Sequence, residues 1–190
     1  LRKCFENIYK VKFESDMRIS TMYSAENEAV LFRENIYPLG NVEDWMLEIE
    51  RVMKESMRQI IRDSLDEYQK TDRTKWVLAW PGQIVIAGCQ TYWTSQVSKA
   101  LEENKLDEYH EKQLKELDAL RQLVRGKLTP TGRQTLSALI VIEVHARDVV
   151  INLLNEKVSD VNDFEWISQL RLASSFSYSF HYFFLIKFYV

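Results

Sequence analysis

The chain has 190 residues, of which 46% are hydrophobic and 28% charged, and its formal net charge is -3. This composition is typical of a folded, mildly acidic protein that forms one domain or a sizeable piece of a larger one. There is no excess of basic residues, which argues against nucleic acid or an anionic membrane surface as the main partner. Cys4 and Cys89 form no metal-type cluster, so we interpret them as reduced intracellular thiols. The sequence opens at Leu1 without an initiator Met or a signal peptide, so we expect a segment of a longer protein.

The first part of the chain predicts the end of a helix followed by a β-hairpin. Residues from Leu1 to about Lys12 have the spacing of a helix tail. Over 18–36, β-favouring residues alternate with polar or smaller ones on both sides of a polar turn at Ser24–Glu28. This alternation predicts two antiparallel strands.

The next segment predicts a long amphipathic helix over 42–68. Pro38 and Gly40 interrupt the chain, and Asn41 with Asp44 has the pattern of a helix cap. Apolar and small residues recur at helical spacing and define one face, which we expect to be core. This face holds Trp45, Ile49, Val52, Met53, Ser56, Met57, Ile60 and Ser64.

The middle of the chain predicts more helices. Helical patterns cover 73–103 and 105–125. Pro81 either kinks the first of these or opens a new helix, and we favour a short helix before it and a longer one from Gln83 to about Glu103.

Two further helices are predicted over 130–158 and 160–171. Thr129 can accept hydrogen bonds from the free N–H groups of the first, and Pro130 suits its first position. That helix is apolar around much of its circumference, so we expect it to lie between other helices. On its narrow polar strip, Glu143 precedes Arg147 by four residues, a spacing that allows the two to pair.

The sequence contains no recognisable catalytic motif. A phosphate-binding GxxxxGK[ST] loop does not occur, and the three histidines are far apart, without the spacing of zinc ligands. His145, near Arg147 and Asp148, could in principle act as a general base, but no nucleophile lies near it in sequence. We therefore interpret it as a partly buried histidine in a helix bundle, and predict no catalytic, cofactor-binding or metal-binding residue.

Several separated motifs closely resemble one protein family. The strings are MYSAENE, PLGNVEDW, WPGQ, LVRGKL, VHARDVV and DFEWISQLR, in this order. They resemble the segment of dynein heavy chains that closes the linker, just before the first AAA+ module of the motor ring. The resemblance extends from near Leu1 to Arg171. The residues that carry it favour the axonemal type of dynein heavy chain.

The resemblance implies a mainly α fold, namely an elongated helical bundle of the linker type with one small β-hairpin near the N-terminus. Residues 1–171 would be the C-terminal part of a linker, the lever that couples ATP hydrolysis in the ring to movement toward microtubule minus ends. ATP and Mg²⁺ would bind only elsewhere in the parent motor. Partners would be the parent's own AAA+ ring, the dynein intermediate, light intermediate and light chains, and microtubules. The location would be the cytoplasm and cytoskeleton, in particular the axoneme of cilia and flagella.

Two groups of residues are candidates for a mechanical role. The candidate hinges and turns are Pro38, Gly40, Pro81, Gly82, Gly126 and Gly132. The candidate structural core comprises Trp45, Trp80, Trp93, His145 and Trp166.

The last nineteen residues, 172–190, do not match the family. They are rich in Phe and Tyr and carry one charge, Lys187. We expect a divergent or artefactual end, with a buried strand pair or a membrane anchor as alternatives. Two other functions compete with the lever: a free-standing helical adaptor, and a helical protein anchored in a membrane by 172–190.

Overall fold

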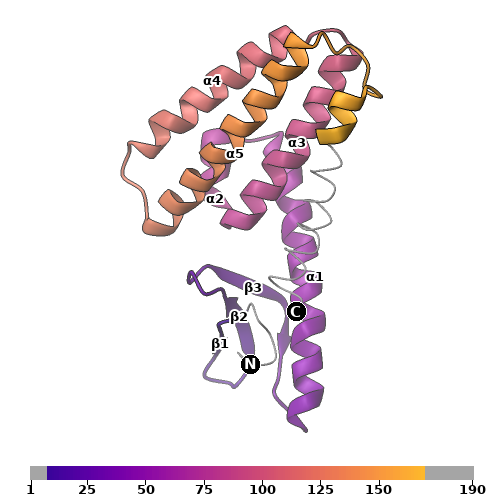
Figure 1. The fold of residues 1–190 in the computed structure, drawn as a ribbon. Helices are drawn as coiled ribbons and strands as arrows, with labels where there is room; N and C mark the ends of the chain where they lie inside the picture. Colours follow the sequence, from indigo (N-terminus) through magenta and orange to yellow (C-terminus); the bar gives the residue numbers. More distant parts are fainter. Residues whose placement is uncertain (1–7, 170–190) are drawn as a thin grey trace. The chain divides into compact units, whose positions relative to one another are not determined.

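In the computed structural model the described residues, 8–169, fall into two compact units. Unit 1 holds 8–66 and unit 2 holds 67–169, so the boundary lies in the last turn of a long helix. From the sequence, 1–171 was expected to be one segment of a linker domain. Figure 1 shows the elements of both units, and each unit is described separately below.

Unit 1 begins with a three-stranded antiparallel sheet. Its strands are β1 (Lys10–Phe13), β2 (Ile19–Tyr23) and β3 (Ala29–Ile36), in the order β1-β2-β3. The predicted hairpin is confirmed as β2 and β3. The predicted helix tail up to about Lys12 is wrong at its end, because β1 pairs with β2 from Lys10↔Tyr23 to Phe13↔Ile19. A four-residue strand is too short for its alternation to be distinguished from a helical spacing, and the neighbouring strand decides its conformation.

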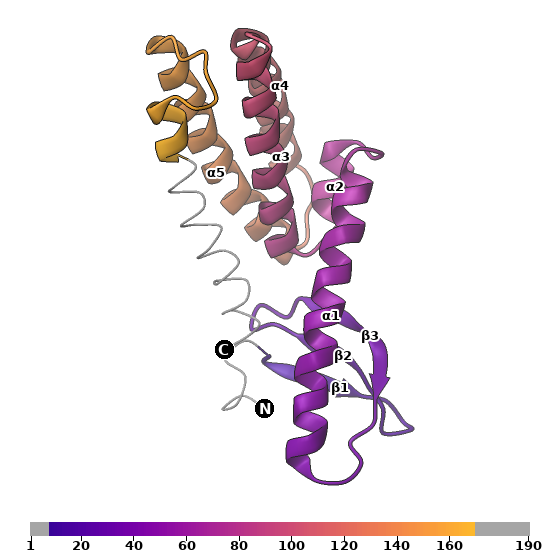
Figure 2. The same ribbon diagram turned by 90° about the vertical axis from the view of Figure 1, so that its right-hand side faces the viewer.

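Helix α1 (Val42–Tyr68) completes unit 1 and has the predicted bounds. Figures 1 and 2 both show it alongside the sheet. Ser56, in the middle of the helix, accepts a hydrogen bond from the backbone N–H of Arg33 in β3 at 2.9 Å. The core of the unit comes from the sheet and the inner face of α1: Ile19, Met22, Val30, Phe32, Ile36, Ile49, Val52, Met53 and Met57 are buried.

Unit 2 is helical. Its helices are α2 (Arg73–Ala79), α3 (Gly82–Glu102), α4 (Leu106–Val124) and α5 (Pro130–Asn155), and residues 164–169 are also helical. The favoured division at Trp80–Pro81 is confirmed, because Trp80 is extended and Pro81 caps α3. The Thr129 cap is confirmed as well: its side chain accepts from the Gly132 N–H at 3.1 Å. The mainly α fold with a small sheet near the N-terminus is therefore as predicted.

Two apolar clusters hold these helices together. We call the first the Trp76 cluster; it joins α2, α3, α4 and α5 through Trp76, Val77, Val85, Cys89, Leu120, Leu136 and Leu139. The second, the Trp166 cluster, joins α3, α4, α5 and the helical residues 164–169 through Val97, Ala100, Leu101, Leu106, Val149, Val150, Leu153 and Trp166. Because α5 contributes to both clusters, its apolar residues are buried along most of its length, as a helix lying between other helices requires.

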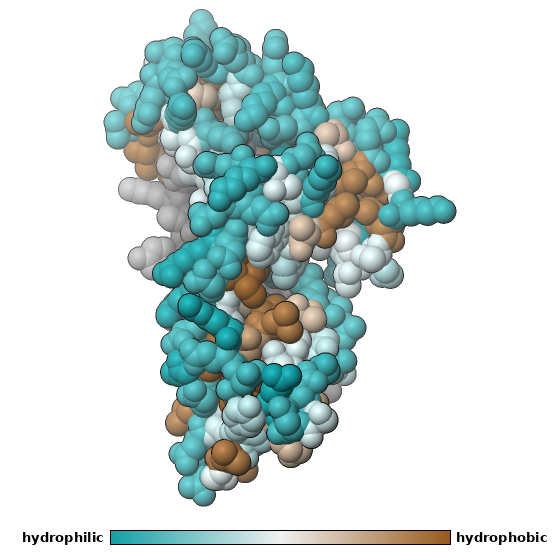
Figure 3. All heavy atoms as spheres, turned by 180° about the vertical axis from the view of Figure 1, so that it is seen from behind, coloured by the Kyte–Doolittle hydropathy of each residue, from teal (hydrophilic) through white to brown (hydrophobic). Residues whose placement is uncertain are grey.

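The face seen in Figure 3 is mainly hydrophilic, with separate apolar patches on it. The most exposed large apolar side chains of unit 1 are Leu39, Leu31, Leu47 and Met17, and those of unit 2 are Val141 and Phe164. Among the described residues, no helix combines the length and apolarity needed to cross a bilayer. The predictions for 172–190 and for Cys4 lie outside the described residues.

Candidate functional site

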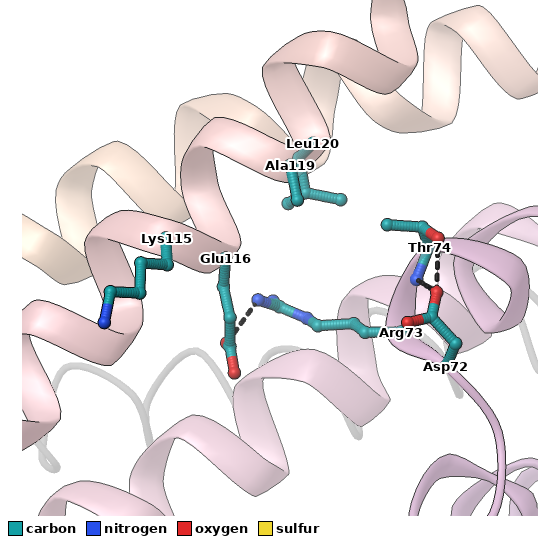
Figure 4. A pocket seen from close by; sticks show the side chains of 7 residues that line it. All are labelled: Asp72, Arg73, Thr74, Lys115, Glu116, Ala119 and Leu120. Carbon is teal, nitrogen blue, oxygen red and sulfur yellow. Dashed lines mark hydrogen bonds and ion pairs between the residues drawn. The ribbon is translucent and has the colours of Figure 1, made fainter.

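The most unusual feature of unit 2 is a charged cluster in its interior, centred on Arg73. Arg73 is the first residue of α2, directly after the N-cap residue Asp72. The Asp72 carboxylate accepts hydrogen bonds from the backbone N–H of Thr74, at 3.0 Å, and from the Thr74 hydroxyl. This cap fixes the residue at which α2 begins. From that position the side chain of Arg73 extends toward Glu116 of α4, as Figure 4 shows.

Two nitrogens of the Arg73 guanidinium bind carboxylates from two other helices. Nη1 donates to Glu116 Oε2 of α4 at 2.7 Å, and Nη2 donates to Glu143 Oε1 of α5. Nη2 also lies 3.7 Å from the Cys89 sulfur of α3. Arg73 thus connects four helices. Its side chain is 16% exposed and that of Glu143 only 6%, so these charges are largely removed from water.

Burial determines the protonation of the groups around this cluster. It raises the pKa of the Glu143 carboxyl above its usual range, an effect that the attraction of Arg73 opposes but does not cancel. It also raises the pKa of the Cys89 thiol to about 11, so Cys89 is a protonated thiol at neutral pH. The pKa of Tyr68 is raised for the same reason.

A pocket of about 280 Å³ opens beside the cluster. It is lined by Asp72, Arg73, Thr74, Lys115, Glu116, Ala119 and Leu120. In Figure 4 the Arg73 guanidinium is paired with Glu116, and Lys115 is directed away from that pair. No group of His, Cys, Asp or Glu suited to a metal ion occurs in the described residues. The arrangement can fix the four helices in place.

The candidate turn residues have different environments. Pro38 and Gly40 lie in the connection from β3 to α1, where Gly40 has a φ of 78° that favours glycine. Gly126 lies in the loop between α4 and α5. The interpretation of Gly82 and Gly132 as turn residues is wrong, because Gly82 begins α3 and Gly132 lies in the first turn of α5. The role of these positions as hinges stays a prediction.

The α4–α5 loop is bridged by an arginine that we did not single out from the sequence. Arg133, in the first turn of α5, donates through Nη1 to the Val124 carbonyl at 2.9 Å and through Nη2 to the Gly126 carbonyl at 3.1 Å. A cation at the end of α4 satisfies a terminal carbonyl and interacts favourably with the helix dipole. The loop is therefore tied to both helices that it connects.

The candidate core residues are buried to different degrees. Trp166 is fully buried, and its ring lies edge-on to that of Trp93, with centroids 5.5 Å apart. Trp93, Trp80 and Trp45 are partly buried; the first two pack against the Trp166 and Trp76 clusters, respectively. His145 is exposed on the outer face of α5, so its assignment to the core is wrong. Helical spacing alone does not show that His145 and Val141 lie on an exposed face of α5.

The expected pairing of Glu143 with Arg147 is also wrong. Glu143 is turned inward to Arg73, whereas Arg147 binds its neighbour Asp148 at 2.6 Å. Arg73 was not among the residues predicted from the sequence. A signal was present, because Arg73 precedes Trp76 and Val77 by three and four residues and so shares the apolar face of α2.

Comparison with known proteins shows consistent similarity to one family. The family described as "Dynein heavy chain, N-terminal region 2" matches residues 1–64. Dynein axonemal heavy chain 1 of Rattus norvegicus is 56% identical over 172 residues, which cover 90% of this chain. Dynein axonemal heavy chain 3 of Homo sapiens is 48% identical over 174 residues, and dynein axonemal heavy chain 12 of Mus musculus is 39% identical over 176 residues, each again over 90% of this chain. The chain spans 4% of the length of the first two relatives and 6% of the third.

Proposed function

Because this chain belongs to the dynein heavy chain family, we propose that it forms the C-terminal part of the linker, the segment just before the first AAA+ module of the motor ring. In this position it acts as a lever that couples ATP hydrolysis in the ring to movement along microtubules. The axonemal type is favoured, so the site of action is the axoneme of a cilium or flagellum.

The observation that carries this proposal is the 56% identity over 90% of the chain to an axonemal heavy chain. A match over 90% of the chain includes residues of both units. A lever must transmit force without bending, and the packing of unit 2 supports that requirement. Its helices share two apolar clusters and a charged cluster, and such close-packed interiors have low compressibility.

The proposal assigns chemistry and binding to the rest of the heavy chain. ATP and Mg²⁺ bind in the AAA+ ring, and this segment neither hydrolyses ATP nor binds a cofactor itself. Its direct partner is the parent's own ring. Intermediate, light intermediate and light chains, and the microtubule, are reached through the parent chain.

The α4–α5 loop offers a test of the lever in a full-length motor. The N–H of Gly126 donates to the Leu123 carbonyl at 3.0 Å. Gly126→Pro removes this donor and restricts the residue before it, so the end of α4 must change. We expect a lower microtubule gliding velocity at an unchanged rate of ATP hydrolysis.

Gly126→Ala is the matched control, because it keeps the N–H. Its added Cβ would lie 3.2 Å from the Leu123 carbonyl oxygen, so the backbone there must move by a few tenths of an ångström. This variant should glide at nearly the normal velocity. Normal gliding and normal ATPase in Gly126→Pro would contradict the lever proposal at this loop.

A further inference from the structure

Helix α2 is too short to hold its own position. It has seven residues, from Arg73 to Ala79, whereas isolated helices shorter than about 12–15 residues are marginal in water. Its place in unit 2 must therefore come from tertiary contacts. Those contacts are of two kinds: the packing of Trp76 and Val77, which includes an edge-on contact of the Trp76 ring with Tyr68 at 4.9 Å between centroids, and the charged contacts of Arg73.

The two kinds of contact constrain the helix differently. The free energy of apolar burial is roughly proportional to the area removed from water and depends less on direction than a hydrogen bond does, so Trp76 and Val77 keep α2 in the core but constrain its register less sharply. Hydrogen bonds of a guanidinium require defined distances and angles. Nη1 is directed to Glu116 of α4 and Nη2 to Glu143 of α5, so only one placement of α2 satisfies both.

The charges of the cluster show which groups depend on Arg73. Glu116 is partly exposed and also lies 3.6 Å from the Lys112 ammonium, so it keeps a cation if Arg73 is removed. For the deeply buried Glu143, Arg73 is the one ion-pair partner that the described part of the chain shows. Other polar groups that interact with the cluster are the neutral Cys89 thiol and the Tyr68 and Tyr109 hydroxyls. Arg73 and Glu143 thus form a pair that can be removed together without leaving a buried charge.

We propose that Arg73 is a positioning residue that sets the register of α2 against α4 and α5, a role distinct from any net contribution to stability. Replacing a buried ion pair by apolar residues of similar volume is often neutral or stabilising, whereas removing one partner is costly. Stability and position can therefore be separated by comparing single and double variants. For the motor, this inference rests on the proposed lever function; for the fold of unit 2, it does not.

The test is hydrogen exchange in the full-length heavy chain, measured by mass spectrometry. Amides of α4 and α5 report the stability of unit 2, and amides of α2 report its local order. In Arg73→Met, we expect faster exchange in α2, α4 and α5. In the double variant R73M/E143M, we expect α4 and α5 to recover wild-type protection while α2 still exchanges about tenfold faster.

Two further variants sharpen the comparison. Arg73→Lys keeps the charge but not the fork of donors, so α2 should still exchange faster in this variant. Arg51→Met is the matched control, since Arg51 also binds carboxylates on other residues, Glu34, Glu48 and Glu55, but is 45% exposed. It should leave the exchange of α2 unchanged.

The outcomes separate this inference from the lever function. Wild-type protection of α2 in R73M/E143M or in Arg73→Lys would show that Arg73 is only a counter-charge and would overturn the inference. Unchanged exchange in Arg73→Met would overturn it as well. If α2 exchanges faster in the double variant but the motor glides normally, the positioning role stands and the lever proposal is contradicted.

Discussion

Arg73 and Glu143 are 70 residues apart in the sequence and form an ion pair in the interior of unit 2. The pair joins the seven-residue helix α2 to the long helix α5. Most charged side chains of the described residues lie on the surface, where ion pairs contribute little to stability. The environment of this pair therefore leads to the first prediction.

The pH dependence of stability should change when Glu143 is replaced. Burial raises the pKa of Glu143 above its ordinary value of 4.5, so the folded state binds a proton more readily than the unfolded state. The stabilisation from this proton is complete below pH 4.5 and is lost as the pH rises through the folded pKa. Relative to the wild type, Glu143→Gln should therefore gain stability as the pH rises through this window.

Urea denaturation of both proteins at a series of pH values measures this difference. Glu165→Gln, which changes an exposed carboxylate, is the control. A stability difference between wild type and Glu143→Gln that does not vary with pH would show that Glu143 has no raised pKa.

Trp166 should contribute strongly to the stability of unit 2. Its side chain is fully buried among α3, α4 and α5. Trp166→Ala should lower the free energy of unfolding by about 3–5 kcal/mol, because it removes a large buried side chain and leaves a cavity. Phe164→Ala is the matched control, as that aromatic ring is 69% exposed. A loss below about 1 kcal/mol in Trp166→Ala would mean that the cavity closes at little cost.

Ser56 should contribute to the stability of unit 1 although its side chain is small. Its buried hydroxyl accepts the N–H of Arg33 in β3 and donates to the Val52 carbonyl at 2.7 Å. Ser56→Ala leaves the Arg33 N–H without this acceptor, and the loss of this part-buried hydrogen bond should cost about 0.5–1.5 kcal/mol. Chemical denaturation measures the loss, and faster exchange of the Arg33 amide should accompany it. If that amide keeps its protection, another acceptor has replaced the hydroxyl.

Thr129 should stabilise the start of α5. Thr129→Ala removes the acceptor for the Gly132 N–H and should cost about 1 kcal/mol. Thr129→Ser keeps the hydroxyl and should stay close to the wild type. Thermal or urea unfolding distinguishes the two variants, and equal losses in both would show that the hydroxyl is not the stabilising group.

Much of the fold could be predicted from local patterns. The bounds of α1 follow from a long apolar stripe. The start of α5 follows from Thr129 and Pro130. The break at Pro81 follows from the geometry of proline. The family could also be predicted, because several rare strings occur in one order. These features depend on neighbouring residues or on similarity, and neither requires knowledge of the tertiary structure.

The sequence by itself determined the helices, the hairpin and the family of this protein, because each is carried by periodicity, capping residues or motifs. Only the tertiary structure decided the partner of Glu143, the strand β1 and the exposure of His145. Helical spacing offers Glu143 a partner at Arg147, but Arg73 meets it inside the unit, where low polarity strengthens the attraction between charges. Such pairings depend on which helices pack together, and local patterns in the sequence do not predict the packing of helices.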